Sequence, residues 1–277
     1  MTDVQVSVIM AVYNGSSTLE RSVGSIIDQS FRDWELVVVD DGSSDDTPLI
    51  LARMAKADQR IKVHSNSSNL GIGASLNVAW RKSACDLIAR MDADDVSLRH
   101  RLERQVEFMA DHPDVSILGT AVELVDRSGN GLGLEYRPEN HNDIVARLFH
   151  EIPVFHPTVM MRRHFLAAMG GYDERLRRAE DLDLWLRSYR RFRFHNLREV
   201  HLRYRVPAKC SWSELLERTL VLVKAAGWDR DAIVHWWYIA RFFVAGLLAF
   251  VGLRSDRRSR LRQAYANKGE DASGHST

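Results

Sequence analysis

Short β-rich runs alternate with helical segments through the first third of the chain, and this alternation most constrains the fold. The predicted strands are rich in valine and isoleucine and cover Val4–Val12, Trp34–Val39, Ile61–His64 and Asp86–Met91. The segments between them have helical patterns and cover Thr18–Gln29, Pro48–Ala57 and Ala74–Lys82. Strands that alternate with helices in this way form βαβ units. We therefore expect an α/β fold, in which helices cover both faces of a mainly parallel central sheet.

Later segments extend this α/β domain to residue 205. They predict two helices, Leu98–Ala110 and Glu180–Arg190, and strands at Val115–Val125, Ile152–Met161 and Arg193–Tyr204. From residue 206 the pattern is entirely helical, with candidate helices at Ser211–Ala226 and Arg230–Leu253. We therefore divide the chain into an α/β domain (1–205), a helical appendage (206–266) and a small polar tail (267–277) that we expect to be disordered.

Charge and cysteine content exclude some classes of protein. The formal net charge is only +1, whereas a chain that mainly binds DNA or RNA usually carries a large basic excess, so we expect no nucleic-acid partner. Two cysteines cannot build a disulfide framework and favour a reducing compartment. The first residues lack the basic and apolar regions of a signal peptide. These features together predict a cytoplasmic protein.

Polar clusters follow four of the predicted strands. They are Tyr13-Asn14-Gly15, Asp40–Ser43, Asn69–Gly73 and Asp92–Asp95. Each could be an ordinary turn, because asparagine, aspartate, glycine and serine all favour turns. In an open α/β sheet, however, ligands bind beyond the carboxyl ends of the strands. Four clusters on one edge therefore predict a binding site.

The cluster that contains Asp92, Asp94 and Asp95 points to a metal ion. Three carboxylates within four residues repel one another unless a cation or hydrogen-bond donors neutralise them. Carboxylate oxygens suit Mg²⁺ or Mn²⁺, which usually share their sites with substrate phosphates. A solvated acidic turn is the alternative. Asp40 and Asp41 could accept hydrogen bonds from a base or a ribose.

Common motifs of other nucleotide and metal sites are missing. The sequence contains no G-x-G-x-x-G, no phosphate-binding G-x-x-x-x-G-K-[ST], and no zinc or hydrolase motif. Farther along, Glu180, Asp181 and Asp183 lie in the first turn of a predicted helix. One of them could be a general base, or all three could simply stabilise the helix dipole. His156 could likewise have either a structural or a functional role.

Taken together, these clusters resemble the inverting glycosyltransferases of family 2, which have the GT-A fold. The segments that carry the resemblance are VSVIMAVYNG (6–15), ELVVVDDGSSDDT (35–47), NLGIGASLN (69–77), ARMDADD (89–95), HPTVMMRR (156–163), GGYDE (170–174) and AEDLDLW (179–185). Their order and spacing also agree with that family, over residues 4–205. Ala11 departs from the proline that is usual at this position.

The resemblance implies roles for particular residues. Asp92 and Asp94 look like the D-x-D pair that binds ribose and a metal-bridged diphosphate, with Asp95 in support. Asp181 resembles the catalytic base, with Glu180 beside it. The nucleotide-sugar side would also include Tyr13, Asn14, Asp40, Asp41, Gly71, Asn77 and Arg90, and His156 and Trp185 would approach the acceptor or the diphosphate.

The implied reaction is a single displacement, dependent on Mn²⁺ or Mg²⁺, that inverts the anomeric carbon. The donor would be a nucleoside-diphosphate sugar, with UDP as the expected nucleotide. The acceptor would be a hydroxyl of a glycan or a lipid-linked molecule in bacterial surface-polysaccharide synthesis. Two alternatives stay open: a nucleotidyltransferase of sugar phosphates, whose glycine-rich basic loop is missing here, and an inactive scaffold that binds nucleotide or a partner at the membrane.

The appendage contains a long apolar and aromatic segment, Ile233–Leu253. Its uninterrupted apolar run, Phe242–Leu253, would form a helix of about 18 Å, which is short against a hydrocarbon core of about 30 Å. Trp236, Trp237 and Tyr238 suit the membrane interface, and five arginines follow the segment. We expect peripheral contact with an anionic membrane, at the inner face of the cell membrane. A soluble helical subdomain is the alternative.

Overall fold

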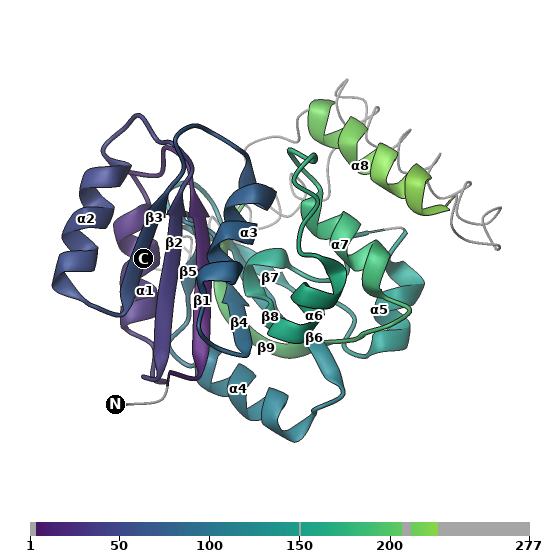
Figure 1. Cartoon of the computed structure of the whole chain (residues 1–277). Helices are drawn as coiled ribbons and strands as arrows, with labels where there is room; N and C mark the ends of the chain where they lie inside the picture. Colours follow the sequence, from purple (N-terminus) through teal and green to yellow (C-terminus); the bar gives the residue numbers. More distant parts are fainter. Residues whose placement is uncertain (1–3, 150, 207–211, 227–277) are drawn as a thin grey trace, which may run out of the picture.

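Four parallel strands form the first half of the central sheet. The computed structural model describes residues 4–149, 151–206 and 212–226 (Figure 1). The parallel strands lie in the order β3 (Ile61–Ser65), β2 (Trp34–Asp40), β1 (Val6–Val12) and β4 (Leu87–Arg90). Valine-rich runs buried on both faces are typical of such strands. The expected α/β class and its parallel strands are thus confirmed.

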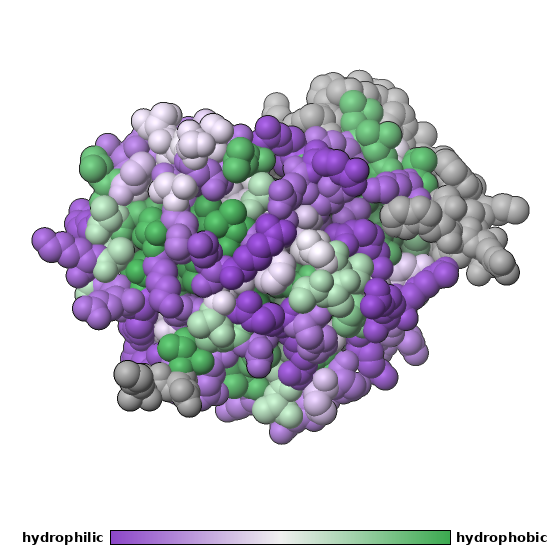
Figure 2. Space-filling view, viewed as in Figure 1, coloured by the Kyte–Doolittle hydropathy of each residue, from purple (hydrophilic) through white to green (hydrophobic). Residues whose placement is uncertain are grey.

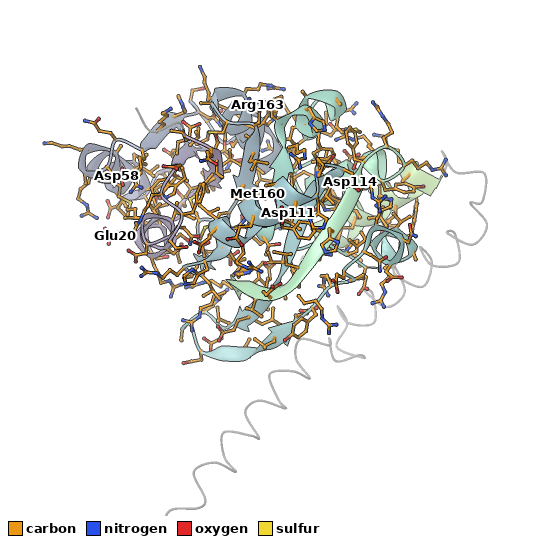
Figure 3. The ribbon with its side chains drawn as sticks, turned by 90° about the horizontal axis from the view of Figure 1, so that it is seen from below. Glu20, Asp58, Asp111, Asp114, Met160 and Arg163 are labelled. Carbon is orange, nitrogen blue, oxygen red and sulfur yellow. The ribbon has the colours of Figure 1, made fainter. Side chains whose placement is uncertain are left out.

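The second half of the sheet mixes strand directions. Beyond β4 it continues with β8 (Met160–Arg162), β6 (Val115–Val125), β9 (Arg193–Arg205) and β5 (Val96–Ser97), and β7 (Gly131–Glu135) pairs with β6. β8 runs antiparallel to both β4 and β6, whereas β6 and β9 are parallel. Seen from below, Met160 of β8 lies in the middle of the molecule (Figure 3). β8 therefore joins the two halves.

The predicted strand Ile152–Met161 is wrong over most of its length. The structure instead forms a short 3-10 turn, η1 (His156–Thr158), before β8 begins at Met160. Pro157 has no N–H for a strand ladder, and its fixed φ suits the first turn of a helix. The turn closes with a hydrogen bond from Thr158 N to Phe155 O (2.9 Å).

Helices cover both faces of the sheet because alternate strand residues enter two different cores. Val8 and Met10 pack in one core, and Ile9 between them packs in the other. The first face holds α1 (Leu19–Ile27), α2 (Thr47–Ala57) and α4 (Arg101–Asp111). The opposite face holds α3 (Ile72–Lys82), α5 (His141–Arg147), α6 (Arg163–Met169) and α7 (Glu180–Ser188). The carboxyl ends of β1, β2 and β4 are thus held firmly from both sides.

One further helix, α8 (Trp212–Ala226), packs beside α7. Its Val221, Leu222 and Ala225 are buried in the core of the α3 face, whereas Leu216 and Leu220 are exposed, and Figure 2 shows apolar surface over this helix. Within the described ranges, no helix is both long and apolar enough to span a bilayer. The segment Ile233–Leu253, the expected helix Arg230–Leu253 and the tail 267–277 lie outside the described residues.

A two-glycine turn after α6 fastens the following loop to α3. Gly170 and Gly171 both have positive φ, 72° and 78°. The Asn77 side chain brackets Tyr172, accepting a hydrogen bond from its N–H (3.0 Å) and donating one to its carbonyl oxygen (2.9 Å). Asn77 is only 1% exposed. This side chain therefore shapes the loop, and its predicted place in the nucleotide-sugar site stays a prediction.

These two glycines give a matched pair of substitutions. In Gly171→Ala, the new Cβ would lie 2.2 Å from Asn77 Oδ1, whereas at Gly170 it meets nothing within 4 Å. Both variants carry the cost of a left-handed alanine, about 1–2 kcal/mol. Gly171→Ala should lose about 1–3 kcal/mol more, because it breaks the Asn77 bracket. Urea unfolding measures the difference, and equal losses in the two variants would contradict this role of Asn77.

Candidate active site

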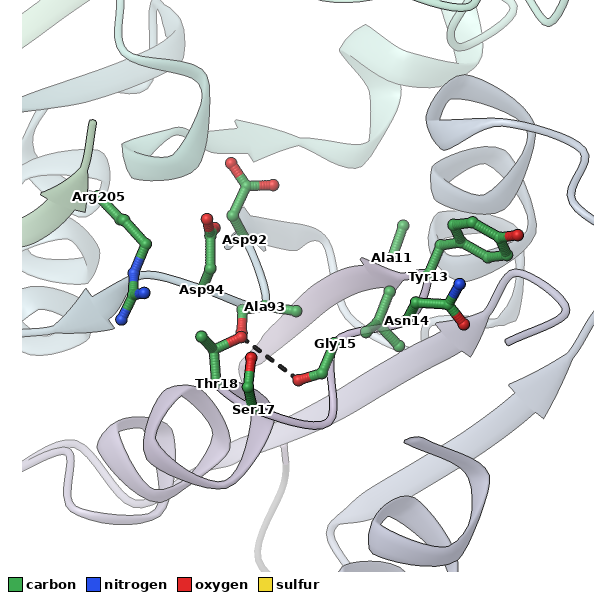
Figure 4. A pocket seen from close by; sticks show the side chains of 11 residues that line it. Ala11, Tyr13, Asn14, Gly15, Ser17, Thr18, Asp92, Ala93, Asp94 and Arg205 are labelled. Atoms are coloured by element: carbon green, nitrogen blue, oxygen red, sulfur yellow. Dashed lines mark hydrogen bonds between the residues drawn. The ribbon is translucent and has the colours of Figure 1, made fainter. Parts of the chain in front are cut away.

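A cleft lies beyond the carboxyl ends of β1, β2 and β4, where the sequence predicts a binding site. It consists of two adjoining cavities that share Ala11, Val12 and Tyr13. The first, of about 340 Å³, is also lined by Asn14, Gly15, Ser17, Thr18, Asp92, Ala93, Asp94 and Arg205 (Figure 4). The second, of about 310 Å³, is also lined by Asp41, Asn69, Gly71, Ile72, Arg177 and Arg178. The fold thus brings all four polar clusters to one cleft.

Three carboxylates gather at the first cavity. Asp92, Asp94 and Asp95 each offer an oxygen within 4.8 Å of the other two. Asp94 reaches the cleft surface, where desolvation and then the charge of Asp92 raise its pKa to about 6. Asp95 is buried, and burial raises its pKa well above the usual value. Among the described residues, no group donates a hydrogen bond to Asp95 Oδ2.

This arrangement suits a divalent cation. Its donors are hard carboxylate oxygens, one of which is buried without a protein partner. Such oxygens are the usual ligands of Mg²⁺ and Mn²⁺. Figure 4 shows Asp92 and Asp94 side by side, with Arg205 beyond Asp94 and Tyr13 and Asn14 at the other end of the cavity. The Arg205 backbone N–H donates to Asp95 Oδ1 (2.8 Å).

A buried arginine binds one member of this cluster, Asp92. Arg90 is 2% exposed, and its two Nη atoms bind both oxygens of Asp92, one at 2.7 Å. Burial disfavours its charge, yet the charges of Asp92 and then of Glu180 raise the pKa of Arg90 overall. Arg90 thus positions Asp92 and lines neither cavity, and its expected contact with the donor stays a prediction.

Of the predicted acidic pair, Asp41 lines the second cavity and Asp40 does not. Asp41 Oδ1 accepts a hydrogen bond from Leu70 N (2.9 Å), and its Oδ2 accepts one from Gly71 N (2.8 Å). Asp41 therefore fixes the loop before α3 at the cavity wall. Asp40 accepts a hydrogen bond from Ser43 N (3.1 Å) within its own turn.

The loop after β1 separates the two cavities. Tyr13 is 51% exposed and lines both, so its ring is open to a ligand. Asn14 has a positive φ of 51°. Its backbone N–H donates to Ser43 Oγ (2.9 Å), and its Oδ1 accepts from Ser44 N (2.9 Å). These bonds tie the first strand-end cluster to the second.

Beneath the cleft, the first turn of α7 joins a buried polar network. Glu180 is 6% exposed, and its Oε1 lies 3.5 Å from His156 Nδ1. His156 Nε2 in turn lies 2.9 Å from Tyr172 Oη. Burial and then the charge of Arg90 lower the pKa of His156 to about 3, so its ring is neutral at pH 7.

Asp181 lies next to this network and is partly exposed. Burial and then the charge of Glu180 raise the pKa of Asp181, and burial also raises that of Glu180. Neither cavity is lined by Glu180, Asp181 or His156. The charge of Asp92 nevertheless acts on the pKa of Glu180 and of His156, and Arg90 experiences the charges of both Asp92 and Glu180.

Trp185 has no exposed surface and lines neither cavity, and its expected contact with an acceptor stays a prediction. Its ring packs with His156 (5.9 Å between centroids), Phe165 and Phe194. An apolar residue one turn along a helix from an acidic pair is a core residue here because α7 presents that face to the sheet.

Sequence reasoning missed several residues at the cleft or behind it, among them Arg205, Arg177 and Arg101. Arg205 follows directly from a predicted strand end, so the strand-end rule could have found it. Arg177 belongs to a loop that reaches the cavity from far along the chain, and no local pattern marks it. Arg101 is fully buried on α4, and its Nη2 donates to the Arg90 carbonyl oxygen (2.7 Å).

Comparison with known proteins shows which family the chain matches. The sequence profile of Glycosyl transferase family 2 matches residues 7–170. The putative glycosyltransferase EpsE of Bacillus subtilis is 40% identical over 202 residues, which are 71% of each chain. The O-antigen biosynthesis glycosyltransferase WbnJ of Escherichia coli is 34% identical over 218 residues, 76% of this chain and 83% of WbnJ.

Solved structures agree with the expected GT-A fold. Staphylococcus aureus TarS 1–349 in complex with UDP-GlcNAc has a TM-score of 0.69 at 20% identity, over 92% of this chain and 77% of that one. The mannosyltransferase PcManGT of Pyrobaculum calidifontis, in complex with GDP-Man and Mn²⁺, has a TM-score of 0.63 at 21% identity. The match covers 95% of this chain and 79% of that one. At these identities the likeness establishes the fold alone, and it confirms the expectation.

Because buried His156 is neutral, we predict how the stability of the protein depends on pH. Its folded pKa of about 3 lies below the unfolded value of about 6.5, so its contribution to stability is present above pH 6.5 and is lost as the pH falls. At pH 5 the loss reaches about 2 kcal/mol. His156→Gln should therefore lose less stability between pH 7 and pH 5 than the wild type does.

Urea unfolding at both pH values measures this difference. His164→Gln is the matched control, because His164 is exposed, and it should retain the wild-type dependence on pH. The same loss of stability in His156→Gln as in the wild type would show that His156 takes up its proton within the folded protein.

Proposed function

Because this chain belongs to glycosyl transferase family 2 and is a glycosyltransferase, we propose that it transfers a sugar from a nucleoside-diphosphate sugar. UDP is the expected nucleotide, and a hydroxyl of a glycan or lipid-linked molecule is the acceptor. The observation that carries this proposal is the double cavity, with an aspartate cluster in one part and Asp41 in the other. Nucleotide sugars named with the neighbours TarS and PcManGT support it.

The biological setting follows from the names of the relatives. WbnJ is named for O-antigen biosynthesis, and AmsE of Erwinia amylovora, 33% identical over 184 residues, for amylovoran biosynthesis. We place the present enzyme in bacterial surface-polysaccharide biosynthesis for that reason.

The nucleoside occupies the second cavity in this proposal. Asp41 Oδ2 accepts one hydrogen bond from Gly71 N and has a further lone pair for a base N–H or a ribose hydroxyl. Gly71 lacks a Cβ and has a φ of 99°, so the backbone can approach the ligand closely. The exposed ring of Tyr13 offers a flat apolar face at the boundary with the first cavity.

The diphosphate lies at the aspartate cluster. Asp92, Asp94 and Asp95 would hold Mn²⁺ or Mg²⁺ there, since their oxygens converge and one of them has no protein partner among the described residues. A bound divalent cation would neutralise the negative charge that develops on the nucleoside-diphosphate leaving group. Arg90 keeps the Asp92 carboxylate oriented for this task.

Asp181 is the proposed general base. A raised pKa makes a carboxylate a better proton acceptor, and burial beside Glu180 raises the pKa of Asp181. Asp181 removes the proton of the acceptor hydroxyl while the oxygen of that hydroxyl bonds to the anomeric carbon. The bond to the diphosphate breaks on the opposite side, so one displacement inverts the anomeric carbon.

Three aspartate variants separate binding from turnover. Asp94→Asn should weaken nucleotide binding in the presence of Mn²⁺ by more than about tenfold, because it removes one charged ligand. Asp181→Asn should retain that binding and lose about 10²–10⁴-fold in turnover, as expected for a missing base. Asp111→Asn removes an exposed carboxylate outside the cleft and should change neither.

Calorimetry with UDP and GDP measures binding, and release of nucleoside diphosphate from a panel of nucleotide sugars measures turnover. Normal turnover in Asp181→Asn would contradict the assignment of the base. Release of pyrophosphate would identify a nucleotidyltransferase instead. Binding without any release would favour an inactive scaffold.

We further propose peripheral contact with an anionic membrane, through residues that lie outside the described ranges. The apolar segment Ile233–Leu253 would enter the interface and bring the active site to a lipid-linked acceptor. The basic residues that follow would add about 1 kcal/mol each near an anionic surface. They are Arg254, Arg257, Arg258, Arg260 and Arg262.

Cosedimentation with lipid vesicles tests this contact. The full chain should bind vesicles rich in phosphatidylglycerol, and 1 M salt or glutamine at all five arginines should release it. Equal binding to neutral phosphatidylcholine vesicles would contradict the electrostatic part. Absence of binding to both kinds of vesicle would favour a soluble helical subdomain.

A further inference from the structure

A loop between α6 and α7 brings two arginines to the second cavity of the cleft. The loop covers residues 173–179, and its Arg177 and Arg178 line the cavity together with Asp41, Asn69 and Gly71. The two arginines lie more than 100 positions from Asp41, Asn69 and Gly71 in the sequence, so only the fold brings the two groups together. Asp92 and Asp94 of the aspartate cluster, by contrast, line the other cavity.

The Arg177 guanidinium has only neutral partners among the described residues. Its Nη1 donates to Asn69 Oδ1 (3.2 Å) and approaches the Asn69 carbonyl oxygen (3.5 Å). Arg175 in the same loop differs, since it binds both oxygens of Asp173, at 2.8 and 2.7 Å. A guanidinium has five N–H donors, so Arg177 keeps its charge and most of its donors for a ligand.

Arg177 also lies directly over the backbone that Asp41 fastens. A Cβ at Gly71 would be 3.2 Å from Arg177 Nη1, and the Gly71 N–H donates to Asp41 Oδ2 (2.8 Å). A cationic donor and a carboxylate acceptor therefore meet at the same glycine. A ligand in this cavity that carries a carbonyl oxygen beside an N–H could bind both.

The loop is held in place by contacts that do not involve a ligand. The Arg178 backbone N–H donates to Glu217 Oε2 of α8 (2.7 Å), and the Leu176 N–H donates to Asp173 O (3.1 Å). The Leu176 side chain packs against the core of the α3 face. Arg177 is thus presented by a preformed loop, which lowers the entropic cost of binding a ligand.

We propose that Arg177 binds the base of the donor nucleotide, which rests on the function proposed above. Its guanidinium donates to a base carbonyl or stacks on the ring, beside the acceptor oxygen of Asp41. Uracil and guanine both present a carbonyl oxygen next to a ring N–H. The base is assigned, and not the diphosphate, because Arg177 lines the cavity that lacks the aspartate cluster.

The test compares Arg177→Ala with Arg175→Ala, a matched control in the same loop whose side chain is 83% exposed and paired with Asp173. The probes are UDP, GDP and inorganic pyrophosphate, each titrated with Mn²⁺ into the full-length protein. Arg177→Ala should bind the nucleotide that the wild type prefers about tenfold more weakly. Its affinity for pyrophosphate, and all affinities of Arg175→Ala, should equal those of the wild type.

Each of the other possible results of these titrations would overturn a defined part of the proposal. Unchanged nucleotide affinity in Arg177→Ala would remove this residue from the site. An equal loss of affinity for pyrophosphate would assign the guanidinium to the phosphates. An equal loss of nucleotide affinity in Arg175→Ala would show that the effect comes from the net charge of the loop. If the wild type binds neither UDP nor GDP, the proposed function itself fails, and this inference with it.

Discussion

The ion pair between Arg90 and Asp92 is the interaction on which the rest of the cleft depends. Three carboxylates within 4.8 Å repel one another, and a guanidinium that is 2% exposed lies directly beneath them. Loss of Asp92 would leave the buried Arg90 charge without this partner, and an uncompensated buried charge is strongly destabilising. The same guanidinium experiences the charge of Glu180 on α7. One buried residue therefore links the aspartate cluster to the helix that carries the proposed base.

Rigid packing on both sides of the sheet makes this arrangement possible. β1 sends Val8 and Met10 into one core and Ile9 into the other, so its carboxyl end can hardly move. The polar loops then build on that fixed edge and hydrogen-bond to one another, as Asn14 does with Ser43. Hydrogen bonds between neighbouring loops thus satisfy polar groups of Asn14, Ser43 and Ser44 at this edge.

Local patterns explain what the sequence could predict. Valine-rich strands, their polar ends and the acidic start of α7 depend on neighbouring residues, and the structure places them as expected. Long-range contacts decided the rest. Asn77 brackets Tyr172 across 95 positions, Arg177 meets Asn69 across 108, and the aromatic core encloses Trp185. Pro157 limited β8 to three residues, because a proline cannot complete the strand ladder.

The central claim is that the cleft holds a nucleoside diphosphate with a divalent cation at the aspartate cluster. Crystals grown with UDP and Mn²⁺, measured at the manganese absorption edge, test it most directly. We predict one anomalous peak within about 2.5 Å of an Asp94 carboxylate oxygen, with the nucleoside beside Asp41 and Tyr13. A bound nucleotide with manganese elsewhere, or with bare aspartates, would contradict the account.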